Sequence, residues 1–267
     1  MKTIYALFGN PVAHSLSPLM HNAAYAHMGI NARYMAFCPR DIKEAIRLIR
    51  EEDIGGASVT IPFKVEVMKY LDRVEESAKA IGAVNTVCRK DGMLVGHNTD
   101  WQGFIADLKM HTDIEGRKFV VLGAGGAARA VLYGLLREGG LPVIVNRTAE
   151  KAAALAEEFG CPCLSIDEMA DAEGDCLINV TSVGMFPGID ASPVQREVLA
   201  RFRRVIDVVY NPIKTKLLQD AESSGCIIHS GLGMFVRQGA EQIRLWTGLE
   251  PPLAIMKNIV LARLTER

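Results

Sequence analysis

Apolar and polar positions along the chain follow two periods that take turns from the N-terminus onward. Short apolar runs such as Ile4–Phe8 have the length and composition of β-strands, and segments with helical spacing such as Asp41–Arg50 follow them. This alternation is typical of α/β proteins with largely parallel sheets. The N-terminal half predicts the strands Ile4–Phe8, Tyr34–Phe37 and Ala57–Ile61 and the helices Ser17–Met28, Asp41–Arg50 and Lys64–Leu71.

A hairpin and a further helix complete this half. Asp91-Gly92 is a strong turn dipeptide, and it joins the predicted strands Ala83–Arg89 and Met93–Val95. Ser17 and Asp100 precede helical segments and are residue types that cap helix N-termini, so each is predicted to be an N-cap. The helix that Asp100 begins is expected to run to about residue 110.

A charged, turn-rich segment, Thr112–Lys118, follows that helix, and we place a domain boundary near residues 101–117. Beyond it the apolar runs are nearly continuous, which is typical of parallel strands buried on both faces. The strands predicted there are Phe119–Leu122, Val143–Val145, Cys176–Val180 and Val205–Val208, and the helices Met234–Thr247 and Leu253–Leu264 close the chain. We therefore expect two α/β domains, residues 1–101 and residues 102–236, with residues 237–267 packed back on the first.

Length and composition bound the class of protein. The chain has 267 residues, of which 49% are hydrophobic, so it can bury its cores without disulfide or metal staples. The net charge of −1, with lysine and arginine scattered, predicts no nucleic-acid partner and no membrane partner. Because the N-terminal apolar run is too short for a signal peptide and no later run could span a bilayer, we expect a cytoplasmic protein. The sequence leaves open whether it is a monomer or a homodimer.

The cysteines do not form a metal-binding pattern. Of the six, only Cys161 and Cys163 are close in sequence, and no second pair or spaced histidines complete a zinc site. Cys176 and Cys226 lie in apolar runs, where cysteine behaves as a small hydrophobic residue. We expect reduced, structural cysteines and no metal site.

A glycine-rich turn lies between the strand Phe119–Leu122 and the helix-forming residues Arg129–Arg137. Its sequence, Gly123-Ala124-Gly125-Gly126-Ala127-Ala128, fits the dinucleotide-binding pattern in its required strand, turn and helix context. Gly123 permits the tight turn, and Gly125 lets the backbone approach a pyrophosphate at the helix N-terminus. Such turns also occur without ligands, but this context favours a nicotinamide dinucleotide.

The end of the next strand indicates which dinucleotide binds. NAD sites usually carry Asp or Glu there for the ribose 2′-hydroxyl, whereas this chain has Asn146-Arg147-Thr148 and no carboxylate before Glu150. An arginine can pair with a 2′-phosphate, and Thr148 can donate a further hydrogen bond. A solvated loop arginine is the simpler alternative. Together with the glycine-rich turn, Arg147 predicts NADP and a Rossmann-type, doubly wound NADP-binding domain over residues 102–236.

Polar residues gather where strands of the N-terminal half end. In an open α/β sheet, ligands bind outside the carboxyl ends of the strands, so these residues should face one crevice. Each has a simpler explanation, because Ser17 and Asp100 could be helix caps, Lys64 an exposed helix-start lysine and Asn85 a turn residue. Taken together, in a chain with a nicotinamide cofactor, they favour a hydroxylated small-molecule substrate. The residues are Ser15 and Ser17, Thr60 and Lys64, Asn85 and Thr86, and Asn98, Thr99 and Asp100.

The ordered motifs of the chain resemble those of the shikimate dehydrogenase family over essentially the whole length. The opening Gly9-Asn10-Pro11 with Ser15-Leu16-Ser17-Pro18 is similar to one family block, and Ser58–Lys64, reading SVTIPFK, is similar to another. The other similar blocks are Gly82–Thr86, Asn98-Thr99-Asp100, Gly123–Ala128, Asn146-Arg147-Thr148, Asn179–Met185, Asp207–Pro212, and Gly231 with Gln238. The resemblance implies an N-terminal α/β substrate domain and the NADP-dependent, reversible reduction of 3-dehydroshikimate to shikimate.

The resemblance also implies roles for individual residues. Lys64 would be the catalytic acid and base, paired with Asp100, and Ser15 and Ser17 would bind the substrate carboxylate. The residues implied to hold the ring hydroxyls are Thr60, Asn85, Asp100 and Gln238, with Tyr210 close by. The positions implied to bind NADP are Gly123, Ala124, Gly125, Gly126, Ala127, Asn146, Arg147, Thr148, Lys151, Val208, Gly231 and Glu76, the last in an ordinary acidic helical segment. The family more often has proline where this chain has Gly233, which should alter packing more than chemistry.

Three alternatives stay open on the sequence. A dual-specificity quinate/shikimate dehydrogenase would tend to use NAD, which Asn146-Arg147-Thr148 argues against. Folate-linked methylene dehydrogenases share the two-domain plan but lack Val59–Lys64. A non-catalytic NADP-binding sensor would explain the glycine-rich turn and Arg147, but it would give no function to the Lys64 and Asp100 pair.

Overall fold

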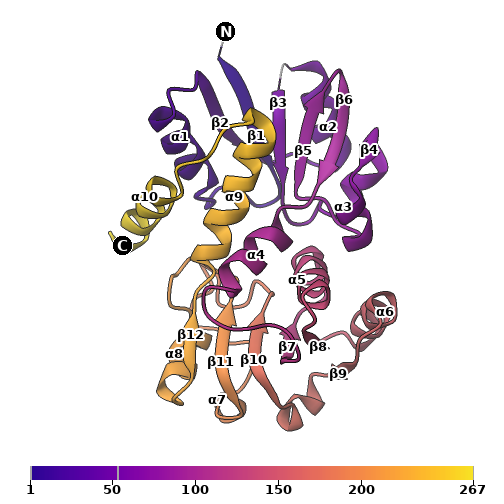
Figure 1. The fold of residues 1–267 in the computed structure, drawn as a ribbon, viewed down its shortest axis with the longest axis vertical. Helices are drawn as coiled ribbons and strands as arrows, with labels where there is room; N and C mark the ends of the chain where they lie inside the picture. The colour runs from indigo at the N-terminus through magenta and orange to yellow at the C-terminus, as the bar shows by residue number, and fades with distance from the viewer. Residues whose placement is uncertain (1, 53, 267) are drawn as a thin grey trace. The chain divides into compact units, whose positions relative to one another are not determined.

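The computed structural model describes residues 2–52 and 54–266, so Met1, Asp53 and Arg267 lie outside the described residues (Figure 1). The chain divides into two compact units. Unit 1 consists of Met1–Gly103 and Val236–Arg267, and unit 2 consists of Phe104–Phe235. Two helices cross the division along the chain, α4 (Asp100–Leu108) and α9 (Leu232–Thr247).

Unit 1 contains a six-stranded mixed sheet of order β2-β1-β3-β5-β6-β4. β1, β2 and β3 run parallel, whereas β5 is antiparallel to both β3 and β6. The strands are β1 (Thr3–Phe8), β2 (Ala32–Phe37), β3 (Ile54–Val59), β4 (Arg73–Val74), β5 (Thr86–Lys90) and β6 (Met93–His97). The helices are α1 (Ser17–His27), α2 (Ile42–Glu51), α3 (Glu76–Ile81) and α10 (Leu253–Thr265), with the 3-10 helix η1 at Glu66–Tyr70.

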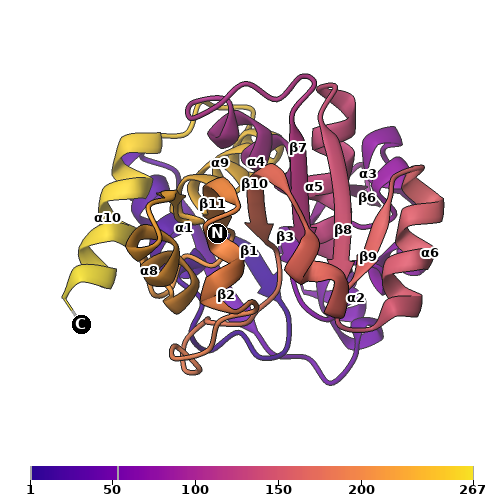
Figure 2. The same ribbon diagram turned by 90° about the horizontal axis from the view of Figure 1, so that it is seen from below.

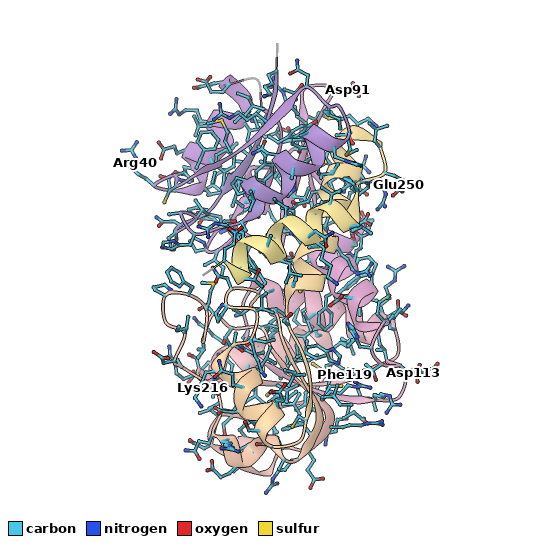
Figure 3. The ribbon with its side chains drawn as sticks, turned by 90° about the vertical axis from the view of Figure 1, so that its left-hand side faces the viewer. Arg40, Asp91, Asp113, Phe119, Lys216 and Glu250 are labelled. Carbon is cyan, nitrogen blue, oxygen red and sulfur yellow. The ribbon has the colours of Figure 1, made fainter. Side chains whose placement is uncertain are left out.

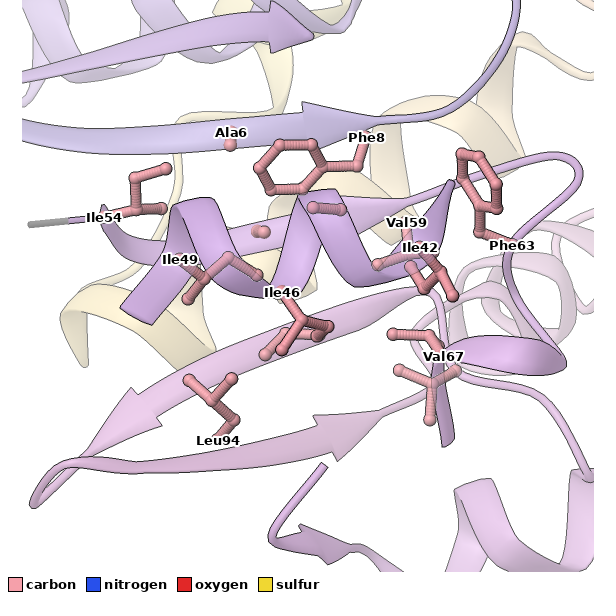
Figure 4. Packing of buried hydrophobic residues seen from close by; sticks show 14 of the residues in the cluster. Ala6, Phe8, Ile42, Ile46, Ile49, Ile54, Val59, Phe63, Val67 and Leu94 are labelled. Atoms are coloured by element: carbon pink, nitrogen blue, oxygen red, sulfur yellow. The ribbon is translucent and has the colours of Figure 1, made fainter. Parts of the chain in front are cut away.

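The core of unit 1 forms where α2 packs on this sheet (Figure 4). Ile42, Ile46 and Ile49 occur at the three- and four-residue spacing that places them on one helix face, and they are buried against Phe8 and Val59. Asp41 accepts a hydrogen bond from the Glu44 amide at 2.9 Å and so caps α2. The core therefore holds the ends of β1 and β3 in fixed positions.

Unit 2 contains a six-stranded sheet of order β12-β11-β10-β7-β8-β9, and every recorded pair in it is parallel (Figure 2). Numbered from β7, this is the doubly wound order 3-2-1-4-5-6, which confirms the predicted fold class. The strands are β7 (Lys118–Leu122), β8 (Leu141–Asn146), β9 (Cys163–Ser165), β10 (Gly174–Asn179), β11 (Phe202–Asp207) and β12 (Ile227–His229). The helices are α5 (Gly126–Arg137), α6 (Ala149–Phe159), α7 (Arg196–Leu199) and α8 (Lys216–Ser223), with the 3-10 helix η2 at Asp167–Asp171.

Charged side chains cover the outside of each unit, while apolar ones fill the interior. Arg40 and Asp91 point away from unit 1, and Asp113 points away from unit 2, whereas Phe119 is fully buried in β7 (Figure 3). Over the described ranges, no helix has the length and apolar composition that crossing a bilayer requires. Within the same ranges, no cluster of three His, Cys, Asp or Glu side chains could hold a metal ion.

Two predicted element boundaries near Lys64 are wrong. β3 spans Ile54–Val59 rather than Ala57–Ile61, so Thr60 lies just beyond the strand. Lys64 does not open a helix, because η1 begins at Glu66 and Lys64 lies in the turn before it. The Thr60 carbonyl instead accepts from the Phe63 amide at 2.9 Å, which closes a turn directly after the strand.

Candidate active site

The polar residues predicted for the substrate gather at one edge of the unit 1 sheet. The parallel strands β1 and β3 both end there, at Phe8 and Val59. β5 runs the other way and begins at the same edge, where Thr86 pairs with Ser58, and β6 ends there, where His97 pairs with Thr86. The segments after β1, β3 and β6 and before β5 therefore converge.

A buried ion pair joins two of these segments. Lys64 Nζ lies 2.6 Å from Asp100 Oδ2, and the side chains are 14% and 7% exposed. The Lys64 carbonyl accepts a hydrogen bond from the Val84 amide at 2.8 Å, which fixes the backbone beneath the ammonium group. Because both groups are shielded from water, their attraction is screened less than that of a surface pair.

Asn85 holds the other side of the Asp100 carboxylate. Its amide nitrogen donates to Asp100 Oδ1 at 2.8 Å and to Thr99 Oγ1 at 2.9 Å. Its amide oxygen accepts from the Thr99 amide at 2.7 Å and from Thr86 Oγ1 at 2.8 Å. Both oxygens of Asp100 therefore have donors, and both amide hydrogens of Asn85 are used.

The predictions that Ser17 and Asp100 are N-caps are wrong. The cap position of α1 is Leu16, with no side-chain cap hydrogen bond, and Ser17 is the first helical residue. Asp100 is likewise the first residue of α4, and Asn98 Oδ1 accepts instead from the Asp100 amide at 3.0 Å and the Trp101 amide at 3.4 Å. Neither side chain caps the N-terminus of its helix. Helix capping therefore does not explain why Ser17 and Asp100 are present.

The remaining predicted substrate residues of unit 1 lie on neighbouring segments. Ser15 Oγ and Ser17 Oγ are 3.2 Å apart, so the two hydroxyls form a pair. Thr60 packs on Gly9, where an added Cβ would come within 2.3 Å of its methyl group. Gly103 lies three residues after Asp100, and an added Cβ there would come within 2.6 Å of the Gln238 amide nitrogen, so α9 passes close to α4 at Gln238.

In unit 2, the residues predicted to bind the dinucleotide lie at the carboxyl ends of its strands. Gly123 follows β7 with φ 121°, a backbone region that favours glycine. Gly125 is the N-cap position of α5 without any side-chain cap, and nothing lies within 4 Å of where its Cβ would be. Gly126 and Ala127 form the first turn, and Ala128 is fully buried. The loop thus leaves open amides and space for a pyrophosphate, so it fits a dinucleotide.

The segment after β8 carries the predicted 2′-phosphate residues. Asn146 Nδ2 donates to the Thr148 carbonyl at 2.9 Å and holds the turn that exposes Arg147. Thr148 takes the N-cap position of α6, but its hydroxyl makes no capping hydrogen bond with the helix. Lys151 is exposed in the first turn of α6. Two cationic side chains and a hydroxyl at one helix start suit a phosphate.

Three more predicted residues belong to unit 2. Gly231 lies against Val208, the residue after β11, because an added Cβ would come within 2.0 Å of the Val208 carbonyl oxygen, so only glycine fits. Tyr210 stacks on Phe235 with ring centroids 3.9 Å apart, and it lies in unit 2 rather than among the substrate residues of unit 1. Gly233 also packs closely, since a Cβ there would lie 1.9 Å from Asp107 Oδ1.

Glu76, the remaining predicted cofactor residue, lies on unit 1. It begins α3 and is 88% exposed, in an ion pair with Lys79 at 2.7 Å. Nothing among its described contacts distinguishes it from an ordinary helix-start glutamate, whose charge suits the helix dipole.

A buried carboxylate lies directly before Val208. Asp207 accepts hydrogen bonds from Thr215 Oγ1 at 2.7 Å, Asn179 Nδ2 at 3.0 Å and the Val209 amide at 3.0 Å. Burial outweighs these bonds and raises the pKa of Asp207 to about 6 from 3.8. Asp207 thus ties the ends of β10 and β11 to Thr215, the cap of α8.

This pKa predicts a pH-dependent loss of stability. A carboxyl whose pKa is raised on folding favours the native state below its unfolded pKa, and that contribution is lost as pH rises through the folded pKa. Between pH 3.8 and about 6, the free energy of unfolding should fall by about 2 kcal/mol relative to Asp207→Asn, which keeps the shape but does not titrate. Urea unfolding of both proteins across this range measures the difference, and a flat difference curve would contradict the assignment.

Sequence analysis missed two buried residues that support the site. Ser58 donates to Gln242 Oε1 at 2.8 Å, and Gln242 Nε2 donates to Thr86 Oγ1 at 3.1 Å. Gln242 lies four residues after Gln238 and hence on the same face of α9, a spacing that could have drawn attention to it.

Comparison with known proteins gives consistent matches along the chain. Residues 7–87 match the shikimate dehydrogenase substrate binding domain, residues 105–198 match shikimate / quinate 5-dehydrogenase, and residues 231–261 match the shikimate 5′-dehydrogenase C-terminal domain. A shikimate dehydrogenase (NADP(+)) of Pyrococcus abyssi is 45% identical over 263 residues, which cover 98% of each chain.

Solved structures agree with these matches. A shikimate dehydrogenase in complex with NADP+ superposes with a TM-score of 0.92 at 40% identity, covering 98% of this chain and 96% of the other. The shikimate 5-dehydrogenase of Thermus thermophilus, in complex with NADP(H) and shikimate, superposes with a TM-score of 0.89 at 36% identity, covering 97% of this chain and 99% of the other.

Proposed function

Because this chain belongs to the shikimate dehydrogenase family, we propose that it catalyses the reversible, NADP-dependent reduction of 3-dehydroshikimate to shikimate in aromatic amino acid biosynthesis. One observation carries the assignment within the molecule itself. The buried Lys64 and Asp100 pair, with Asn85 behind it, lies at the sheet edge where an α/β protein binds its ligand. A lysine and a carboxylate held there suit a reaction that moves a proton at a ring oxygen.

The substrate is held by hydroxyl, amide and charged groups of unit 1. The paired hydroxyls of Ser15 and Ser17 donate hydrogen bonds to the substrate carboxylate. Thr60, Gln238 and Asp100 hold the ring hydroxyls. Asn85 is assigned to the same group by the family resemblance, and its amide nitrogen orients Asp100 by donating to Oδ1. Tyr210 is assigned to the substrate by the family resemblance alone.

Lys64 moves the proton. Its ammonium group donates a hydrogen bond to the ring ketone oxygen, stabilises the negative charge that develops there, and gives up a proton as the hydroxyl forms. In the reverse direction Lys64 accepts that proton from the substrate hydroxyl. Asp100, 2.6 Å from Nζ, keeps the ammonium group aimed at the reacting oxygen. The bound NADPH supplies the hydride that completes the reduction.

Unit 2 binds the cofactor through backbone and side-chain donors. Amides of Ala124, Gly125, Gly126 and Ala127 would bind the pyrophosphate at the start of α5. Gly123, whose own amide donates to the Val145 carbonyl at 2.8 Å, would permit the tight turn around it. Arg147 pairs with the 2′-phosphate, supported by Asn146, Thr148 and Lys151. Val208 and Gly231 would also contact the cofactor, and Glu76 is the remaining position that the family resemblance assigns to it. The predicted domain roles follow: residues 1–101 with 237–267 bind substrate, and residues 102–236 bind NADP.

Gly125 offers a test of the cofactor site that separates binding from folding. Since no atom lies within 4 Å of its missing Cβ, Gly125→Ala should leave thermal stability unchanged. The added methyl group would occupy the space next to the pyrophosphate, so the Kd for NADP+ should rise about tenfold or more. Fluorescence titration with NADP+ and a thermal melt of the same sample measure both. Unchanged affinity would contradict the placement of the pyrophosphate.

The activity itself is tested by mixing the protein with NADPH and 3-dehydroshikimate. We expect absorbance at the NADPH band to fall and NMR spectra to show shikimate formed in the same molar amount. Disappearance of NADPH without shikimate would contradict the assignment. The cytoplasmic location, the absence of nucleic-acid and membrane partners, and a monomeric or homodimeric state are retained as predictions from the sequence.

A further inference from the structure

A chain of hydrogen bonds runs through the buried part of unit 1 and ends on the Asp100 carboxylate. Its outer half lies behind the sheet edge. Tyr34 donates to Ser58 Oγ at 2.6 Å, and Ser58 donates to Gln242 Oε1 at 2.8 Å. Tyr34 and Gln242 are each 1% exposed and Ser58 is 5% exposed, so no solvent replaces these bonds.

The inner half continues from the same glutamine. Gln242 Nε2 donates to Thr86 Oγ1 at 3.1 Å, and Thr86 donates to Asn85 Oδ1 at 2.8 Å. Asn85 Nδ2 then donates to Asp100 Oδ1 at 2.8 Å, while Lys64 donates to the other oxygen of Asp100. Every donor in the chain therefore faces toward the carboxylate.

One backbone amide fixes this direction. The Thr99 N–H can only donate, and it lies 2.7 Å from the Asn85 side-chain atom assigned as Oδ1. Asn85 must therefore turn its NH2 group toward Asp100. Thr86 Oγ1 lies 2.8 Å from Asn85 Oδ1 and 3.4 Å from Thr99 Oγ1, so it donates its single hydroxyl hydrogen to the nearer oxygen, that of Asn85. Thr86 can then only accept from Gln242, which leaves Gln242 Oε1 facing Ser58 as an acceptor. Ser58 in turn gives its hydrogen to Gln242 and accepts from Tyr34.

We propose that Tyr34, Ser58, Gln242 and Thr86 are positioning residues for the reaction, which hold Asn85 and, through it, the Asp100 and Lys64 pair; this rests on the proposed function. A reversed Asn85 amide would place two oxygen atoms 2.8 Å apart at Asp100, where they repel. The chain of hydrogen bonds prevents this reversed orientation of the Asn85 amide. It does not conduct protons, because two of its members are amides, and it does not include Ser15 or Ser17.

Tyr34 and Tyr25 form a matched pair for the test. Both rings are 1% exposed and lie in the same aromatic cluster beside His21. The Tyr34 hydroxyl begins the chain, whereas the Tyr25 hydroxyl has no hydrogen-bond partner among the described residues. Tyr34→Phe retains the ring, whose centroid lies 4.0 Å from that of His21, and removes the hydroxyl that donates to Ser58.

The experiment measures kcat and KM for shikimate with NADP+ in both variants. Tyr34→Phe should lower kcat about three- to tenfold, the effect of one buried hydrogen bond on the reacting geometry. The KM for shikimate should change less than kcat, because Ser15 and Ser17, the proposed carboxylate-binding residues, are not part of the hydrogen-bond chain. Tyr25→Phe should retain the kcat of the unchanged protein. Ser58→Ala breaks the next bond and should reproduce the effect of Tyr34→Phe.

Thr86→Val separates positioning from a general loss of stability. This substitution cuts the chain between Gln242 and Asn85, so Tyr34→Phe should lower kcat no further in that background. Equal kcat values in Tyr34→Phe and Tyr25→Phe, or additive losses of kcat in the double variant, would overturn the positioning role of the hydrogen-bond chain. The proposed function would not be affected by either result. No turnover by the unchanged protein would overturn the proposed function and the role of the chain with it. NADP+ titration of each variant verifies that it is folded.

Discussion

Lys64→Ala should lower kcat for shikimate oxidation by about 10²- to 10⁴-fold, the usual effect of removing a general acid or base. The substitution removes the ammonium group that lies 2.6 Å from Asp100 and that would exchange a proton with the substrate oxygen. The Kd for NADP+ should stay unchanged, because the predicted cofactor residues other than Glu76 lie in unit 2. Steady-state kinetics and NADP+ titration measure the two effects separately.

A neighbouring lysine provides the control for this substitution. Lys69 lies in η1, only five positions along the chain, and is exposed. Lys69→Ala should therefore retain full activity. A Lys64→Ala variant that raised KM but kept kcat would show that Lys64 binds substrate without transferring a proton, and the acid and base assignment would be wrong.

Arg147→Ala should raise the KM for NADP+ about 10- to 100-fold, as expected from the loss of hydrogen bonds to a charged phosphate. The KM for NAD+ should change little, because NAD+ has no 2′-phosphate. Arg147 is exposed directly after β8, and no carboxylate lies in the strand or turn to favour a free 2′-hydroxyl. Initial rates with each cofactor at saturating shikimate give both constants.

Arg201→Ala is the matched control, since Arg201 is an exposed arginine of the same unit that lies before β11. It should leave both KM values unchanged. Equal losses for NADP+ and NAD+ in Arg147→Ala would mean that Arg147 contacts a part common to both cofactors. The 2′-phosphate assignment would then fail.

Much of the fold could be predicted because long apolar runs encode it directly. The four predicted strands of unit 2 are all present and parallel. β3 shows why the boundaries of elements are harder to predict than the presence of the elements. Its first half contains Gly55 and Gly56, which usually disfavour strands, but the indole of Trp246 occupies the space of a Cβ at Gly56, within 2.4 Å. That contact comes from a helix almost two hundred residues away, and no local pattern reports it.

The candidate site shows the same division between local and distant information. Asn98 and Asp100 are both good N-cap residues, so sequence alone cannot choose between them. The choice is made by Lys64, which draws the Asp100 carboxylate away from the helix start and leaves the capping bonds to Asn98. Motif resemblance supplied Lys64 and Asp100 as a pair, but it gave no role to Ser58 and did not include Gln242, because their partners are fixed only by folding.

The most direct test of the whole account is a set of initial rates measured with shikimate or quinate, each with NADP+ or NAD+. The rate with shikimate and NADP+ should greatly exceed the other three. Comparable rates with quinate or with NAD+ would contradict it and indicate a dual-specificity enzyme. Binding of NADP+ without turnover of either acid would contradict it more deeply, because the Lys64 and Asp100 pair would then have no proton to move.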